Sequence, residues 1–165
     1  LFRSVLEKCS EFFYIDEKEG TDTMEEDLKK LYDEGKKAFG FYCGKGEWFL
    51  LTLKNIDIMS QMLPNVSKAS QSLDVSVLHT LILEKIFGID KENMAKQINL
   101  TYTKFFTEAI DGVDKGEFQC SFVLNPTRVT EIRDVAAAGE KMPQKSTYFY
   151  PKMITGMVMN NLGVD

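Results

Sequence analysis

A glycine-rich turn between two apolar segments is the feature that most constrains the fold of this chain. Residues 38–43 and 47–54 are rich in aromatic and branched side chains, and Gly44, Lys45 and Gly46 separate them. Two apolar segments of strand length joined by a three-residue glycine turn are typical of a β-hairpin. The sequence therefore predicts that these two segments pair as antiparallel strands around Gly44–Gly46.

Helical and strand-like patterns flank the hairpin on both sides. Helices are predicted over residues 2–13, 23–37, 74–87, 104–115 and 125–139, strands at 12–16, 98–102, 120–124 and 146–150, and a last helix from Pro151. The segment 55–72 is expected to be a short helix followed by a serine-rich loop. Strands that alternate with helices, together with one hairpin, predict an α+β (or α/β) domain in which several helices cover a mixed β-sheet.

Three residues are expected to begin helices. Thr23 stands three residues before Glu26, which is capping-box spacing. Asp74 is placed to cap the helix that runs towards Phe87. Asn125 is expected as an N-cap, with Pro126 in the first turn of the following helix.

Length and composition predict one globular domain over residues 1–165. The chain is 44% apolar and 27% charged, which is ordinary for a folded domain. No apolar run approaches the roughly 18 residues of a membrane span, and the acidic first twenty residues do not resemble a signal peptide. We expect a cytoplasmic protein without a membrane segment. The first residue is Leu1, which is compatible with the C-terminal part of a longer protein.

Charge and cysteine content restrict the classes of partner. The formal net charge is −5, so nucleic-acid binding is not expected, because phosphate contacts need a positive footprint. Three scattered cysteines and one histidine provide neither a disulfide framework nor the usual ligands of a zinc site. No metal site is therefore predicted.

The segment 141–152 is the first candidate for an anion site. Lys141, Lys145 and Lys152 occur there without any acid, and hydroxyl side chains including Ser146 and Tyr148 lie between them. Lysines and hydroxyls are groups that hold a phosphate or carboxylate. The spacing from Gly139 resembles a P-loop, but a glutamine replaces its second glycine and a proline removes one backbone donor, so we reject that reading. The alternative is a lysine-bearing surface loop.

The start of the helix after residue 125 is the second candidate. Asn125 and Arg128 lie where free N–H groups and positive potential accumulate, and a bound anion would relieve the repulsion between Arg128 and the helix dipole. The alternative is a salt bridge from Arg128 to Glu131. If both candidates serve one function, Arg128 and Lys145 should converge near the C-terminal edge of the strands, with an anion or an acid such as Asp74 or Glu131 between them.

His79 and Asp74 are possible acid or base groups. His79 lies on a largely apolar helical face, so a satisfied, partly buried histidine is the alternative to a general base. No Ser/His/Asp or Cys/His constellation follows from the spacing.

The C-terminal half resembles a known family. The runs Phe122–Val129 and Ala138–Lys152, together with Ser72–His79 and the hairpin, are similar to a bacterial and archaeal family catalogued as the domain of unknown function numbered ten-fifteen. Full-length members of that family carry an upstream region like the phosphate-binding loop of the ParB/sulfiredoxin superfamily, which this sequence lacks. The resemblance implies a C-terminal domain whose partner is the upstream domain of the same protein.

The leading hypothesis is a phosphate- or nucleotide-handling protein, with phosphoryl transfer as a possible reaction. Lys141, Lys145, Ser146 and Arg128 would contribute anion contacts, since phosphoryl transfer depends mainly on positioning and charge neutralisation. A non-enzymatic scaffold or protein-interaction domain is the alternative, and a DNA-associated regulator ranks last.

Overall fold

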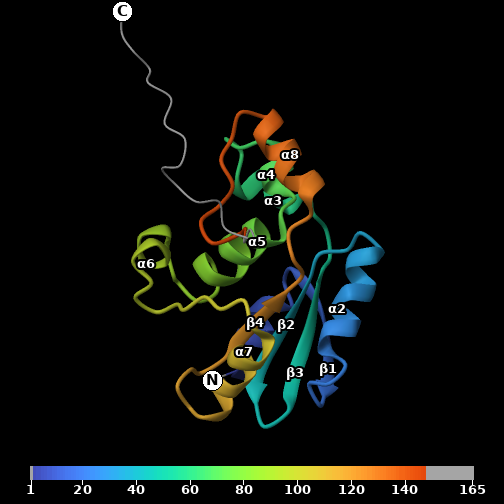
Figure 1. Cartoon of the computed structure of the whole chain (residues 1–165), viewed down its shortest axis with the longest axis vertical. Helices are drawn as coiled ribbons and strands as arrows, with labels where there is room; N and C mark the ends of the chain where they lie inside the picture. The colour runs from blue at the N-terminus through green and yellow to red at the C-terminus, as the bar shows by residue number, and fades with distance from the viewer. Residues whose placement is uncertain (1, 148–165) are drawn as a thin grey trace, which may run out of the picture.

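The computed structural model describes residues 2–147, which form a four-stranded sheet with helices on both faces and a helical region beyond one end (Figure 1). The elements, in chain order, are α1 (Phe2–Cys9), β1 (Phe13–Glu19), α2 (Met24–Asp33), β2 (Ala38–Gly44), β3 (Glu47–Leu53), α3 (Ile58–Met62), α4 (Lys68–Gln71), α5 (Asp74–Val77), the π-helix η1 (Leu78–Glu84), α6 (Lys91–Lys96), α7 (Phe106–Asp114), β4 (Ser121–Leu124) and α8 (Val129–Ala137). The predicted α+β class is confirmed.

The hairpin is the centre of the sheet. The strand order is β1-β3-β2-β4, and β2 pairs with β3 in antiparallel register from Ala38↔Thr52 to Gly44↔Glu47, as the turn predicted. Every strand pair within residues 2–147 is antiparallel, whereas a mixed sheet was predicted. The difference matters because the strands then have no common C-terminal edge at which a ligand would bind.

Alternation along the strands gives each face of the sheet its own core. Phe39 and Phe41 point to one face, where they pack with α1, α3, η1 and α6, while Ala38 and Tyr42 point to the other, under α2 and α7. This period of two is the normal geometry of a strand, and both faces are buried because helices cover both.

A smaller third cluster lies outside the sheet. Leu73 and Val75 pack with Val135 of α8, and Met142 covers them from the segment that follows α8. Figure 1 shows α8 beside α4 in the helical upper part of the molecule, away from the sheet. The contact of Met142 with this cluster holds the segment that follows α8 against α5 and α8.

Two predicted elements differ from the structure. The segment 98–102 is not a strand, and Ile98 is 62% exposed, because an apolar pattern alone does not give a strand a partner to pair with. The predicted serine-rich loop contains α4, since the hydroxyl of Ser67 accepts a hydrogen bond from Ser70 N and caps that helix.

The predicted helix from Asp74 to Phe87 is interrupted. It begins as α5 and continues as η1. The five-residue spacing of a π-helix persists just beyond η1, where the amide of Phe87 donates to Ile82 O at 3.0 Å. Gly88 follows with φ +72°, a left-handed conformation that suits glycine and ends the helix as predicted.

Two of the three predicted N-caps are wrong, and the third, Thr23, occupies the N-cap position without making the side-chain bond. Thr23 precedes α2 but has a helical backbone and makes no side-chain cap bond. Leu73 precedes α5, so Asp74 is already its first residue, and α8 begins after Arg128 rather than after Asn125. For Asp74 and Asn125, a tertiary contact with Lys37 and with Leu28 O, respectively, uses the side chain instead.

Some expectations fall outside the described part of the chain. The predicted strand 146–150 is described only as far as Thr147, and the helix from Pro151, with Tyr148 and Lys152, lies beyond it. Within residues 2–147, every helix is too short or too polar to cross a lipid bilayer.

Candidate functional site

Arg128 is held by the end of α2. Its guanidinium lies 3.8 Å above the ring of Tyr32 and donates a hydrogen bond to Tyr32 O in the last turn of that helix. A cation is favourable at a helix C-terminus, so α2 relieves the repulsion that Arg128 experiences at the start of α8. This arrangement was missed because Tyr32 is 96 residues away in the sequence.

Glu131 does not pair with the guanidinium, contrary to the alternative considered above. Its Oε2 accepts a hydrogen bond from the backbone N–H of Arg128 at 2.9 Å, which is one half of a capping box. Its Oε1 accepts from Lys37 Nζ at 3.1 Å. Glu131 therefore joins the start of α8 to the segment between α2 and β2.

Lys37 lies between two carboxylates and is the residue that sequence reasoning missed. Its Nζ is 2.7 Å from Asp74 Oδ1 and 3.1 Å from Glu131 Oε1, and the three side chains are 18%, 10% and 20% exposed in the order Lys37, Asp74, Glu131. The antiparallel pairing of Phe39 with Leu124 brings the start of β2 beside the end of β4, and hence Lys37 close to α8. We call these three residues the ion triad.

Burial and charge act in opposite directions on the ion triad. Burial raises the pKa of Asp74; Lys37 counteracts it in part, and the pKa remains above its ordinary value. Burial lowers the pKa of Lys37, but the two carboxylates outweigh burial and hold that pKa above its ordinary value. Asp74 Oδ1 forms an ion pair with Lys37 but no well-oriented hydrogen bond. Attraction to the lysine charge is therefore what mainly offsets the cost of burying this carboxylate.

Residues 141–147, which we call the lysine segment, return to the start of α8. The hydroxyl of Thr127 donates to Ser146 O at 2.9 Å, and the Ser146 hydroxyl donates to Pro143 O at 2.6 Å. Lys145 adopts φ +60°, a left-handed conformation that is uncommon for lysine and completes this tight turn. The predicted proximity of Ser146 to the beginning of α8 is therefore found, although no sheet edge organises it.

Lys141 and Lys145 are both exposed. Neither forms an ion pair with any residue in the range 2–147. Asp74 and Glu131, two acids close to the start of α8, pair with Lys37 instead. The lysine charges therefore face solvent without an intramolecular carboxylate.

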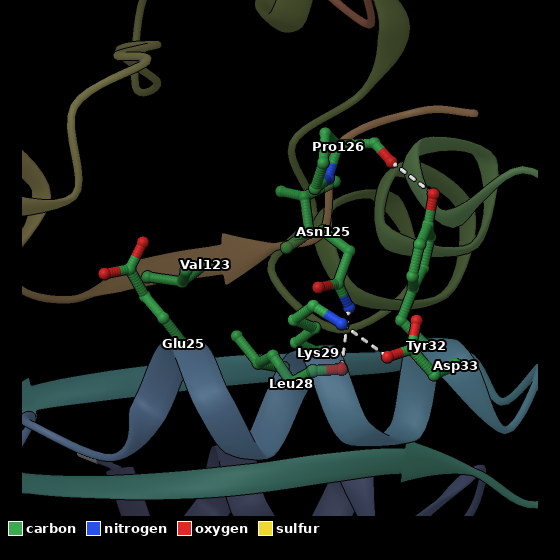
Figure 2. Close-up of a pocket in the computed structure, with 9 residues that line it drawn as sticks. Glu25, Leu28, Lys29, Tyr32, Asp33, Val123, Asn125 and Pro126 are labelled. Atoms are coloured by element: carbon green, nitrogen blue, oxygen red, sulfur yellow. Dashed lines mark hydrogen bonds and ion pairs between the residues drawn. The ribbon is translucent and has the colours of Figure 1, made fainter. Parts of the chain in front are cut away.

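Asn125 lines a shallow groove between α2 and the end of β4 (Figure 2). Its amide Nδ2 donates to Leu28 O at 3.0 Å, and the Tyr32 hydroxyl donates to Pro126 O at 3.1 Å across the same groove. The groove has a volume of about 310 Å³, with Leu28 and Val123 among its apolar lining residues. The Asn125 amide is therefore committed to structure and is not directed at the lysine segment.

His79 lies in η1, half-buried, and its Nε2 is buried without a hydrogen-bond partner among residues 2–147. Burial lowers the pKa of His79, so the imidazole is neutral near pH 7. Among residues 2–147, its Nε2 makes no hydrogen bond to the ion triad. His79 Nε2 is therefore not bonded to Asp74, the other residue predicted as a possible acid or base.

The described residues contain no group of three or more His, Cys, Asp or Glu side chains that could hold a metal ion. Comparisons of the chain with protein-family models, with curated proteins and with solved structures found no match.

Proposed function

We propose that this chain is the C-terminal domain of a cytoplasmic protein that binds a phosphate-bearing ligand, with Lys141, Lys145 and Ser146 among its anion contacts. The observation that carries the proposal is the Thr127–Ser146 hydrogen bond, which holds the lysine segment against the start of α8. Two lysines without carboxylate partners beside a helix start are suited to an anion.

The ion triad supports this proposal through charge. Two carboxylates beside the start of α8 would repel a phosphate if they stood alone, but Lys37 neutralises part of their charge. Arg128 adds a further positive charge in the same region. We expect Lys141 and Lys145 to contact the ligand and Arg128 to act at longer range, since its guanidinium is held by Tyr32.

The family resemblance extends the proposal. In a protein of the family numbered ten-fifteen, the nucleotide loop would be supplied by an upstream ParB/sulfiredoxin-like domain, and this chain would neutralise the phosphate charge. Phosphoryl transfer is then the reaction class, because its catalysis consists mostly of positioning and electrostatic stabilisation.

The test is calorimetric titration of the 165-residue chain with pyrophosphate and with ATP at low ionic strength. We expect binding by the wild type and at least a tenfold weaker affinity for Lys145→Ala. Lys91→Ala is the matched control, because Lys91 is also exposed but lies in α6. Equal affinities for the two variants, or no binding by the wild type, would refute the proposal.

A protein-interaction domain is the second candidate. Ile98 and Phe105 are 62% and 52% exposed on the segment between α6 and α7, and exposed apolar side chains of this size favour contact with another protein. Sedimentation of the chain alone at increasing concentration tests self-association. A shift towards a dimer that Ile98→Ser abolishes would support this candidate.

A further inference from the structure

Cys43 and Cys120 lie at the same end of the β2–β4 strand pair. The β2–β4 register runs from Phe39↔Leu124 to Tyr42↔Ser121, and Cys43 and Cys120 are the next residue on each side, where β2 has an irregularity between Tyr42 and Gly44. Residues directly opposite in an antiparallel pair have Cα atoms about 4.5–5.5 Å apart. A disulfide requires Cα atoms roughly 4.4–6.8 Å apart, which residues that follow directly on an opposed pair can reach.

The two side chains also share one face of the sheet. Phe41 and Phe122, two positions before Cys43 and two after Cys120, stack with ring centroids 4.8 Å apart. Cys43 and Cys120 both pack against the apolar cluster to which Phe41 and Phe122 belong, so they lie on that same face. Both are free thiols and partly exposed.

We propose that Cys43 and Cys120 form a reversible intramolecular disulfide that fastens β4 to β2 under oxidising conditions. The oxidant is a low-molecular-weight disulfide such as oxidised glutathione. One protein thiolate attacks the external disulfide, forms a mixed disulfide and releases one thiol. The second protein thiol loses its proton to solvent, attacks the protein sulfur of the mixed disulfide and releases the second thiol. Two electrons pass from the protein to the oxidant.

The local environment makes this exchange slow. Burial raises the pKa of Cys43 to about 12 and that of Cys120 to about 11, so few thiolates exist near pH 7. The pair would therefore respond to a sustained change in the thiol–disulfide balance and not to a brief pulse of oxidant. The bond would close the long loop between the two strands at the end of β4 opposite Asn125.

The test is overnight incubation of the folded chain with oxidised glutathione at about pH 8.5, a value chosen to increase the thiolate fraction, then alkylation and tryptic digestion without reductant. We expect a linked pair of peptides, 38–45 and 116–128, and one alkylated thiol per chain, that of Cys9. Cys9→Ala should retain the link, whereas Cys43→Ser and Cys120→Ser should lose it. The oxidised wild type should melt several degrees higher than the reduced form, because the bond constrains the unfolded chain.

Three results would overturn the proposal. Three alkylatable thiols in the folded chain after incubation, while the urea-unfolded chain oxidises, would show that the geometry is unsuitable. A link that contains Cys9 would assign the wrong partner. An oxidised wild type that melts lower than the reduced form would show that the bond strains the sheet. The digest of the wild type alone shows whether a link forms and which cysteines it joins, so these two results do not depend on the folding of a serine variant.

Discussion

Lys37 Nζ lies 2.7 Å from Asp74 Oδ1, and the two side chains are only 18% and 10% exposed. Removing one partner of such a buried pair leaves an uncompensated charge in a poorly solvated site, which costs far more than the loss of a surface pair. The contact joins the beginning of β2 to the beginning of α5. It therefore couples the sheet to the helical region that carries the candidate anion site.

We predict that Lys37→Met lowers the free energy of unfolding by about 3 kcal/mol at pH 7, because it leaves Asp74 and Glu131 close together without their cation. Urea unfolding followed by circular dichroism measures this change. Lys36→Met is the control, since the Lys36–Glu34 pair is exposed and should contribute almost nothing. Equal unfolding midpoints for the two variants would contradict the role of the ion triad.

Glu140 is predicted to stabilise the chain through α4. Its carboxylate accepts hydrogen bonds from the amide and hydroxyl of Ser67, both at 2.7 Å, and from the Ser70 hydroxyl, and these bonds lower its pKa. A lowered pKa means that the stabilisation is present above the ordinary carboxyl pKa and is lost as the pH falls through the folded value. Glu140→Gln should therefore be less stable than the wild type at pH 7, by a difference that shrinks as the pH falls towards about 3. A difference that stays constant between these two pH values would contradict this prediction.

The hairpin and the ion triad show what the sequence can and cannot predict. The hairpin depends on Gly44–Gly46 and the residues beside them, so a short window contains the whole signal. Lys37 and Glu131 are 94 residues apart, and only the pairing of β2 with β4 brings them together. The position of Lys37 directly before an apolar strand was the one available signal, but a lysine at a strand end is usually exposed.

Of the residues predicted to bind an anion, some lie where they were expected and others make contacts that the sequence did not predict. Ser146 was expected near the start of α8 if the two segments serve one function, and its hydrogen bond with Thr127 places it there. Arg128 was expected to need an anion, but the end of α2 supplies Tyr32 instead. Helix dipoles act through tertiary contacts as well as within their own helix, and such contacts cannot be predicted from local spacing.

His79 is predicted to make the chain less stable as the pH falls below its ordinary pKa of about 6.5. Burial lowers its pKa in the folded state, so the unfolded chain binds more protons in that interval and stability decreases with acidification. His79→Gln removes the titration while retaining a polar side chain. Unfolding free energies of both proteins between about pH 5 and 7 test the prediction, which fails if the variant keeps the full pH dependence of the wild type.

Gly40 is predicted to be intolerant of a side chain. A Cβ at this position would lie 2.8 Å from Sδ of Met24. Met24 is the first residue of α2 and is completely buried. Gly40→Ala should therefore lower stability by about 1–3 kcal/mol through overpacking. In the Met24→Ala background the same change should cost much less, because the space is then free. Additive effects in this double-mutant cycle would contradict the contact.

We predict that the 165-residue chain does not bind duplex DNA appreciably at about 0.15 M salt, where charges more than about 8 Å apart are largely screened. Its net charge is −5, and the basic residues Lys141 and Lys145 form only a short cluster. Non-specific DNA binders neutralise several phosphates at once and lose affinity steeply as salt rises. Anisotropy titration of a labelled duplex should show no saturation at micromolar protein, and pyrophosphate binding in the same buffer serves as the positive control for the proposed anion site. Micromolar DNA binding that weakens with added salt would show that the lysine segment recognises a polyanionic backbone instead of a small phosphate-bearing ligand.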